Sequence, residues 1–192
     1  MEIYAHIDET GTRLPAGRRL YGLAAVLTAA ADHALVSATM TGLLLPRQRW
    51  LHHYDETHDR RVKIAEALAP LPLIGTIFLV TPTDRNRQEQ ARAALLVELL
   101  PHLQHTEKAT RVVVESRQAG DRHDRRVRDR PRRSHRIDAA MPVDHKVKDA
   151  DPGLWVADFI AGAYIAAHHH EEPEPWDILC AAHVIEVRHL SE

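Results

Sequence analysis

Three acidic residues lie where the pattern of the sequence does not favour a polar side chain. Asp158 is the one charged residue of LWVADFIAGAYIAA, a segment that would be apolar on all other sides of a helix. Asp8 ends an alternating run at the start of the chain, and Glu115 ends the apolar run RVVVE. A buried carboxylate without a partner is costly, so its surroundings must supply a cation or metal ion, or must raise its pKa.

Acids that end two buried strands, and an acid on a covering helix, can converge at one end of a sheet. Three such carboxylates carry the charge to hold one or two Mg²⁺ or Mn²⁺ ions. Ions held in this way activate water and stabilise the leaving oxygen in phosphodiester cleavage. Two simpler interpretations stay open. Asp158 can form a buried salt bridge with an arginine or touch water at the helix edge, and Asp8 can be a turn former.

The hydrophobic periodicity predicts the elements that position these acids. The first strand is predicted to end at the turn-like sequence Thr10-Gly11-Thr12. Residues 33–45 fit either a third strand or a helix that begins after Asp32. Antiparallel strands followed by helix-linked strands predict one α/β domain over residues 1–192, a mixed sheet with helices packed on it. The predicted elements are strands at 2–8, 20–28, 73–80 and 111–115, an edge strand within 137–147, and helices at 55–68, 86–103, 154–167 and 176 to about 190.

The composition excludes several classes of protein. One cysteine, Cys180, excludes an internal disulfide and suits a reducing compartment. No apolar run approaches the roughly 20 residues of a membrane helix, and the start of the chain lacks the pattern of an export signal. The eight glycines form no phosphate-binding loop of a nucleotide enzyme. We therefore expect a cytoplasmic protein without a nucleotide cofactor.

Four segments resemble a known bacterial family. IDETG at 7–11, GLAAVL at 22–27, VVVESR at 112–117 and KDADPGLWVADFIAGA at 148–163 are similar to the family labelled domain of unknown function 3800 (DUF3800). That family resembles RNase H-like nucleases, so the resemblance implies an RNase H-like mixed sheet with helices packed on it. Carried over by position, the resemblance implies a catalytic group of four acids, Asp8, Glu9, Glu115 and Asp158.

The resemblance departs from the RNase H pattern in the first long helix. RNase H enzymes usually supply another acid there, and this chain offers no clear match. His52 and His53 lie near the expected place and are candidates to complete the site. Asp84 follows the predicted strand at 73–80, and it would replace Glu115 as a metal ligand if that strand lay beside the first one.

Arginines are concentrated in one segment of the chain. Residues 121–136 contain eight arginines, two histidines and three aspartates, and Gly120 and Pro131 favour a basic loop or insert at 118–136. Guanidinium groups bind phosphate in bidentate fashion, so the segment could follow a nucleic-acid backbone. No aromatic residue lies there to stack on bases, and a solvated loop is the simpler alternative. The nucleic-acid-binding candidates are Arg117, Arg122, Arg125, Arg126, Arg132 and Arg133.

These observations favour a divalent-metal-dependent nuclease, a hydrolase of DNA or RNA. Asp8, Glu115 and Asp158 would hold Mg²⁺ or Mn²⁺, and Glu9 would assist. One alternative is a non-catalytic nucleic-acid- or protein-binding module that uses the arginine segment. Another is a structural subunit of a bacterial defence or mobile-element assembly, in which the acids balance buried arginines. Nucleic acid is the expected partner, with a homodimer or a partner protein as further expectations.

Overall fold

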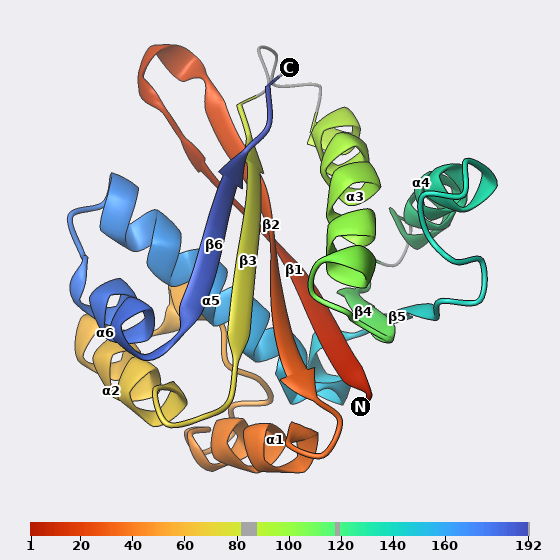
Figure 1. The fold of residues 1–192 in the computed structure, drawn as a ribbon. Helices are drawn as coiled ribbons and strands as arrows, with labels where there is room; N and C mark the ends of the chain where they lie inside the picture. Colours follow the sequence, from red (N-terminus) through yellow and green to blue (C-terminus); the bar gives the residue numbers. More distant parts are fainter. Residues whose placement is uncertain (82–87, 118–119, 192) are drawn as a thin grey trace.

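One mixed β-sheet runs through the centre of the molecule (Figure 1). The computed structural model describes residues 1–81, 88–117 and 120–191, and within these ranges six strands pair in the order β5-β4-β1-β2-β3-β6. Among them β2 runs antiparallel to both its neighbours, and the remaining pairs are parallel. The strands are β1 (Ile3–Arg13), β2 (Arg19–Ala29), β3 (Ile74–Val80), β4 (Arg111–Glu115), β5 (Val143–Lys146) and β6 (Val184–His189).

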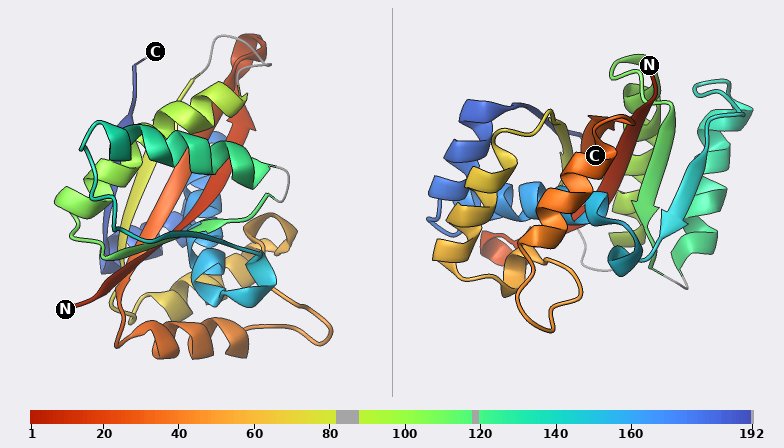
Figure 2. Two further views of the ribbon diagram at one scale, coloured as in Figure 1. Left: turned by 90° about the vertical axis from the view of Figure 1, so that its right-hand side faces the viewer. Right: turned by 90° about the horizontal axis from the view of Figure 1, so that it is seen from below.

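Helices cover both faces of the sheet (Figure 1, Figure 2). α3 and α4 lie on one face, and α1, α2, α5 and α6 lie on the other. Each helical layer buries a separate apolar core against the sheet, which agrees with the apolar runs of the central strands. The helices are α1 (His33–Gly42), α2 (His58–Leu68), α3 (Gln88–His105), α4 (Asp121–Arg133), α5 (Pro152–His169) and α6 (Glu174–Ala182).

β1 is buried on both faces, and its alternation decides which side chains meet which helices. Ala5 and Ile7 belong to the core on the α3 face. His6 and Asp8 therefore point to the α5 face, since successive side chains of a strand alternate. These two polar side chains are only 1% and 2% exposed. Each needs a partner inside the protein, because burying an unpaired polar group is unfavourable.

The prediction that β1 ends near Asp8 was wrong. β1 continues to Arg13 and pairs without interruption with β2, from Ile3 opposite Ala29 to Arg13 opposite Arg19. Gly11 lies inside this ladder rather than in a turn. A Cβ at Gly11 would lie 2.8 Å from the carbonyl oxygen of Leu20, so the glycine permits a close approach of the two strands.

The predicted basic loop at 118–136 contains a helix, α4. Val127 and Pro131 are buried at helical spacing on the side that meets α3, and they supply the apolar contact that a loop would lack. The acidic Asp121 in the first turn and the arginines of the last turn suit the helix dipole. Gly120 precedes the helix, and Pro131 lies in its last turn. The prediction of a loop from Gly120 and Pro131 was therefore wrong, and the segment is helical.

The predicted helix from Trp176 to about residue 190 is also only half correct. α6 ends at Ala182, and β6 follows directly and pairs in parallel with β3. The residues of β6 include two valines and an isoleucine, which favour a strand. Gly75 of β3 lies against Ile185, where a Cβ would approach its side chain to 3.1 Å. β6 thus extends the sheet beyond β3.

The remaining elements agree with the sequence predictions. The mixed sheet and its covering helices confirm the α/β class. Residues 33–42 adopt the helical alternative, and β5 is the edge strand predicted within 137–147. Within the described ranges, every helix is either too short or too polar to cross a membrane.

Candidate functional site

The sheet register brings Asp8 and Glu115 side by side. β1 and β4 run parallel with Ile7 paired to Val114, so the next residue of each strand lies at the same level. Both acids point toward α5, because Ile7 and Val114 belong to the core on the α3 face. α5 packs against β1 on this side of the sheet and carries Asp158. We call Asp8, Glu115 and Asp158 the carboxylate cluster.

Lys148 lies at the centre of the carboxylate cluster. Its Nζ is 2.8 Å from Asp8 Oδ2, 3.0 Å from Asp158 Oδ1 and 3.6 Å from Glu115 Oε1. Lys148 begins a short 3-10 turn just before α5, and its carbonyl accepts a hydrogen bond of 2.6 Å from Trp155 Nε1. The backbone is therefore fixed where the side chain can reach all three acids. One ammonium group neutralises part of the charge of three carboxylates.

The pKa values of these groups reflect this crowding. Burial raises the pKa of Asp8 well above its ordinary value, and a hydrogen bond with Glu115 raises it further. Burial by itself would lower the pKa of Lys148, but Asp8 and Asp158 outweigh this effect and hold it above the ordinary value. Lys148 is thus firmly protonated, and the cluster still carries more negative charge than Lys148 balances.

His52 and His53 contact Asp158 in different ways. His52 Nδ1 is 3.0 Å from Asp158 Oδ1, and the backbone N–H of His53 donates to Oδ2 at 2.7 Å. Burial raises the pKa of Asp158, but His52 and Lys148 together hold it below the ordinary value. The hydrogen bond to Asp158 raises the pKa of His52. Burial, followed by Arg61, lowers the pKa of the His53 ring to about 4, so this ring is neutral at pH 7.

Gly162 allows the segment with His52 and His53 to lie against α5. A Cβ at Gly162 would lie 2.3 Å from His53 Cγ, which is far inside van der Waals contact. We expect Gly162→Ala to displace His53, to weaken both contacts to Asp158 and to lower the free energy of unfolding by about 1–3 kcal/mol. Urea denaturation measures the loss of stability. An NMR titration should show the pKa of His52 falling toward its ordinary value.

Gly42, at the end of α1, provides the matched control for this substitution. A Cβ there would meet no atom within 4 Å. Gly42→Ala is therefore expected to leave the pKa of His52 unchanged and to preserve stability. If Gly162→Ala left both the stability and the pKa of His52 unchanged, as Gly42→Ala should, the inference that packing of His53 on α5 orients Asp158 would be wrong.

Glu9 does not join the carboxylate cluster. Because β1 continues beyond Asp8, Glu9 points to the opposite face of the sheet. Its Oε2 accepts hydrogen bonds from the Tyr21 hydroxyl at 2.6 Å and from Arg92 NH1 at 3.0 Å. The sequence prediction grouped Glu9 with the other acids because the resemblance to DUF3800 implied it by position. In the structure its carboxylate is engaged by groups of the α3 layer.

The six arginines predicted to bind nucleic acid lie on or near α4. Arg117 pairs with Glu89 at 2.6 Å and with Asp124 at 3.3 Å, and Arg132 donates to the carbonyl of Met141 at 2.6 Å. These two side chains therefore have structural partners. The other four are exposed along α4, namely Arg122, Arg125, Arg126 and Arg133.

A cleft of about 1020 Å³ opens over the carboxylate cluster. None of the six predicted arginines is among its lining residues, whereas Arg13, Arg19 and Arg61 are. Arg13 and Arg19 come from the end of the β1–β2 hairpin, beyond the strands predicted at 2–8 and 20–28. Lys148 also lines the cleft and was not singled out, although it belongs to one of the segments that resemble DUF3800. Asp84 lies outside the described residues.

Sequence comparisons give no assignment for this chain. No protein-family model and no curated protein matches it. The resemblance to DUF3800 thus rests on the short sequence segments alone.

Solved structures, in contrast, share the fold. A chain in the structure of the PCNA:RNase HII complex from Archaeoglobus fulgidus matches with a TM-score of 0.55 and 17% identity, covering 90% of this chain and 76% of that one. The crystal structure of a mutant Bst-RNase HIII matches with a TM-score of 0.51 and 14% identity, covering 88% of this chain and 53% of that one. The six-stranded mixed sheet with its two helical layers is therefore an RNase H-like fold.

Proposed function

We propose that this protein is a divalent-metal-dependent nuclease that hydrolyses phosphodiester bonds of DNA or RNA at the carboxylate cluster. The observation that carries the proposal is the convergence of carboxylates from β1, β4 and α5 on one cation position. Carboxylate oxygens are the ligands that Mg²⁺ and Mn²⁺ prefer. The RNase H-like fold, shared with structures of RNase HII and RNase HIII, adds support by analogy.

The chemistry of the donor set suits a divalent ion. Asp8 and Asp158 are almost fully buried, and Glu115 completes an oxygen-only group around the Lys148 ammonium. An ion would have to draw the three carboxylates together, because they are not among the groups of described residues whose ligand atoms lie within 4.8 Å of one another. Asp8, Glu115 and Asp158 would hold the ion, and the Lys148 side chain would turn toward the cleft that it already lines. A bound divalent ion supplies activation of water and stabilisation of the leaving oxygen.

The residues around the cluster have separate tasks in this proposal. His52 and the backbone N–H of His53 fix the orientation of the Asp158 carboxylate. The hydrogen bond to Asp158 raises the pKa of His52, which makes this ring a candidate proton carrier beside the cluster. Glu9 also lines the cleft, but its carboxylate is bonded to Tyr21 and Arg92, so it is not one of the proposed metal ligands.

Two groups of arginines are available for the phosphate backbone. Arg13 and Arg19 line the cleft from the β1–β2 hairpin and are exposed. They are placed to hold a strand next to the carboxylate cluster. The exposed arginines of α4 lie on the other helical layer, so they would contact a more distant part of a nucleic acid.

The test compares the wild type with Asp158→Asn in melting scans with EDTA, Mg²⁺ and Mn²⁺, together with cleavage of labelled DNA and RNA. We expect metal to raise the melting temperature of the wild type and not that of Asp158→Asn. Cleavage should fall by on the order of 100- to 1000-fold, the range for losing one preorganised electrostatic contact. Asp177→Asn, an exposed position on α6, is the matched control and should behave as the wild type.

The opposite result would favour the non-catalytic binding module. The contact of Lys148 with all three carboxylates is the observation on which that second function rests, because the ammonium already occupies the cation position. Identical melting curves with and without metal, and no cleavage, would overturn the nuclease proposal. Binding of nucleic acid that survives Asp158→Asn but fails after alanine replacement of the four predicted arginines exposed on α4 would then support the binding module. These four are Arg122, Arg125, Arg126 and Arg133.

A further inference from the structure

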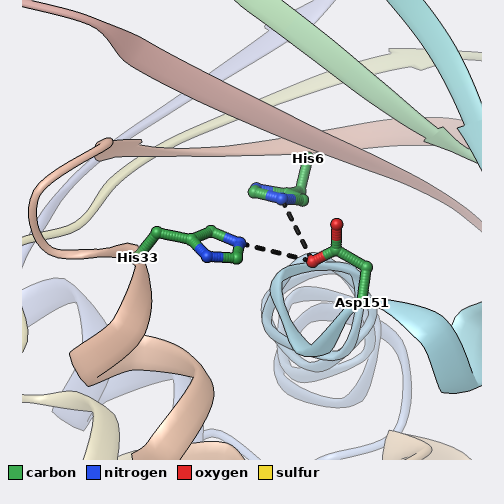
Figure 3. Close-up of side chains that lie close together, drawn as sticks. All are labelled: His6, His33 and Asp151. Carbon is green, nitrogen blue, oxygen red and sulfur yellow. Dashed lines mark ion pairs between the residues drawn. The ribbon is translucent and has the colours of Figure 1, made fainter.

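A second cluster of potential ligands lies on the same face of the sheet as the carboxylate cluster (Figure 3). His6 of β1, His33 at the start of α1 and Asp151 at the N-terminus of α5 place three ligand atoms within 4.8 Å of one another. His6 and Asp151 are 1% and 2% exposed, and His33 is 29% exposed. We call these three residues the histidine–aspartate triad.

Two distances in the triad match those of a tetrahedral zinc site, and the third pair of ligand atoms, those of the two histidines, lies within 4.8 Å. His6 Nε2 lies 3.3 Å from Asp151 Oδ1, and His33 Nε2 lies 3.4 Å from the same oxygen. Zinc binds nitrogen and oxygen ligands at about 2.0–2.1 Å, so two ligand atoms of a tetrahedron are about 3.3–3.4 Å apart. Both distances are long for a hydrogen bond between these groups. They equal the edge of the zinc tetrahedron.

His6 has a single partner among the described residues, the long contact of its Nε2 with Asp151 Oδ1 at 3.3 Å. Neither of its ring nitrogens makes a hydrogen bond to any described residue, although the side chain is buried. Gly153 allows the ring to lie against the start of α5, because a Cβ there would lie 2.6 Å from His6 Nε2. The chain thus holds an imidazole beside a carboxylate with its Nδ1 unpaired and its Nε2 in one long contact.

The other contacts of Asp151 leave its Oδ1 directed at the two histidines. The backbone N–H of Gly153 donates to Oδ1 at 3.1 Å, as expected of a helix N-cap. Lys146 Nζ lies 2.8 Å from Oδ2. Such outer contacts orient a carboxylate ligand and are common around metal ions.

We propose that His6, His33 and Asp151 bind one Zn²⁺ ion, with the remaining position open on the side of the partly exposed His33. Two imidazoles and one carboxylate suit zinc, whereas Mg²⁺ and Ca²⁺ prefer oxygen ligands alone. The ion joins the N-termini of α1 and α5 to β1. His6 lies two residues before Asp8, so the same ion fixes the helix of Asp158 against the strand of Asp8.

Zinc titration of the metal-free, full-length protein against a chromophoric chelator tests the proposal. The wild type is expected to bind one equivalent in this triad. His33→Ala and Asp151→Asn should each weaken binding by on the order of 100-fold or more, since even outer-shell changes cost 10- to 100-fold. Co²⁺ in place of Zn²⁺ should give the visible spectrum of a tetrahedral site in the wild type and lose it in both variants. His33→Ala is decisive if Asp151→Asn fails to fold, because His33 is partly exposed.

Three control variants separate the triad from other binding groups. Asp158→Asn alters the carboxylate cluster, His169→Ala alters the histidine run that ends α5, and Glu107→Gln alters the group of His102, Glu107 and Glu186. Each should retain the zinc affinity of the wild type. Absence of zinc binding in the wild type, or equal affinity in His33→Ala, would overturn the proposal. Loss of zinc binding in any of the three control variants would also overturn it. Nuclease activity is not the readout, so this result is independent of the proposed function.

Discussion

In EDTA, replacing Lys148 with methionine is expected to lower the free energy of unfolding by about 3–5 kcal/mol. The substitution keeps an unbranched side chain and removes the ammonium that lies 2.8 Å from Asp8 and 3.0 Å from Asp158. Both carboxylates are almost fully buried, so they lose a compensating charge at a place that water hardly reaches. Equilibrium urea denaturation at neutral pH measures the loss.

Divalent metal should restore most of that stability in the Lys148→Met protein. The position left by Nζ is surrounded by carboxylate oxygens, and an ion that binds the folded state stabilises it by mass action. Mg²⁺ or Mn²⁺ should therefore raise the melting temperature of Lys148→Met more than that of the wild type. Lys63→Met, at an exposed position on α2, is the control and should show neither effect.

The pattern of results separates the two candidate functions. A large loss of stability that metal reverses would support a metal position within reach of Lys148. A large loss that metal does not reverse would mean that Lys148 is a permanent partner of the acids, as the binding-module interpretation requires. Unchanged stability in EDTA would contradict the inference that the ammonium balances the cluster.

The placement of the carboxylate cluster was accessible from the sequence because each acid belongs to an element with clear periodicity. RVVVE predicts a buried strand that ends at Glu115, and the apolar segment around Asp158 predicts a buried helix. Asp8 also lies on a strand with a buried alternation. Lys148 lies in a short 3-10 turn without periodicity, so no pattern indicated that it would reach all three acids.

Other parts of the structure depend on pairing that local patterns do not contain. Glu9 points away from the cluster because β1 and β2 stay paired through Gly11, and a glycine between threonines looked like a turn. The histidine–aspartate triad unites residues 6, 33 and 151, which only the packing of α1 and α5 on β1 brings together. α4 was missed for a similar reason, since its buried residues are few and include Asp124, which is paired with Arg92 of α3.

The Arg92–Asp124 pair leads to a second large expected effect, on stability. Arg92 is 1% exposed and donates to both carboxylate oxygens of Asp124, at 2.8 to 3.1 Å, and to Glu9 at 3.0 Å. We expect Arg92→Met to lower the free energy of unfolding by about 3–5 kcal/mol, because a buried carboxylate is left without its main partner. Denaturation in urea measures the loss. Arg117→Met removes a single 3.3 Å contact with Asp124 and the ion pair with the exposed Glu89, and it should cost much less.

A double variant and the pH dependence show whether the unpaired charge causes this loss. Arg92→Met combined with Asp124→Leu removes both charges, and it should recover most of the stability that Arg92→Met loses. In the wild type, burial would raise the pKa of Asp124, but His145 and Arg92 hold it below the ordinary value. Without Arg92, one of the groups that lower the pKa of Asp124 is lost, so Asp124 takes up a proton at a higher pH than in the wild type. The difference in stability between wild type and Arg92→Met should therefore shrink as the pH falls. A difference that stays constant with pH would point to lost packing of the Arg92 side chain rather than to the charge of Asp124.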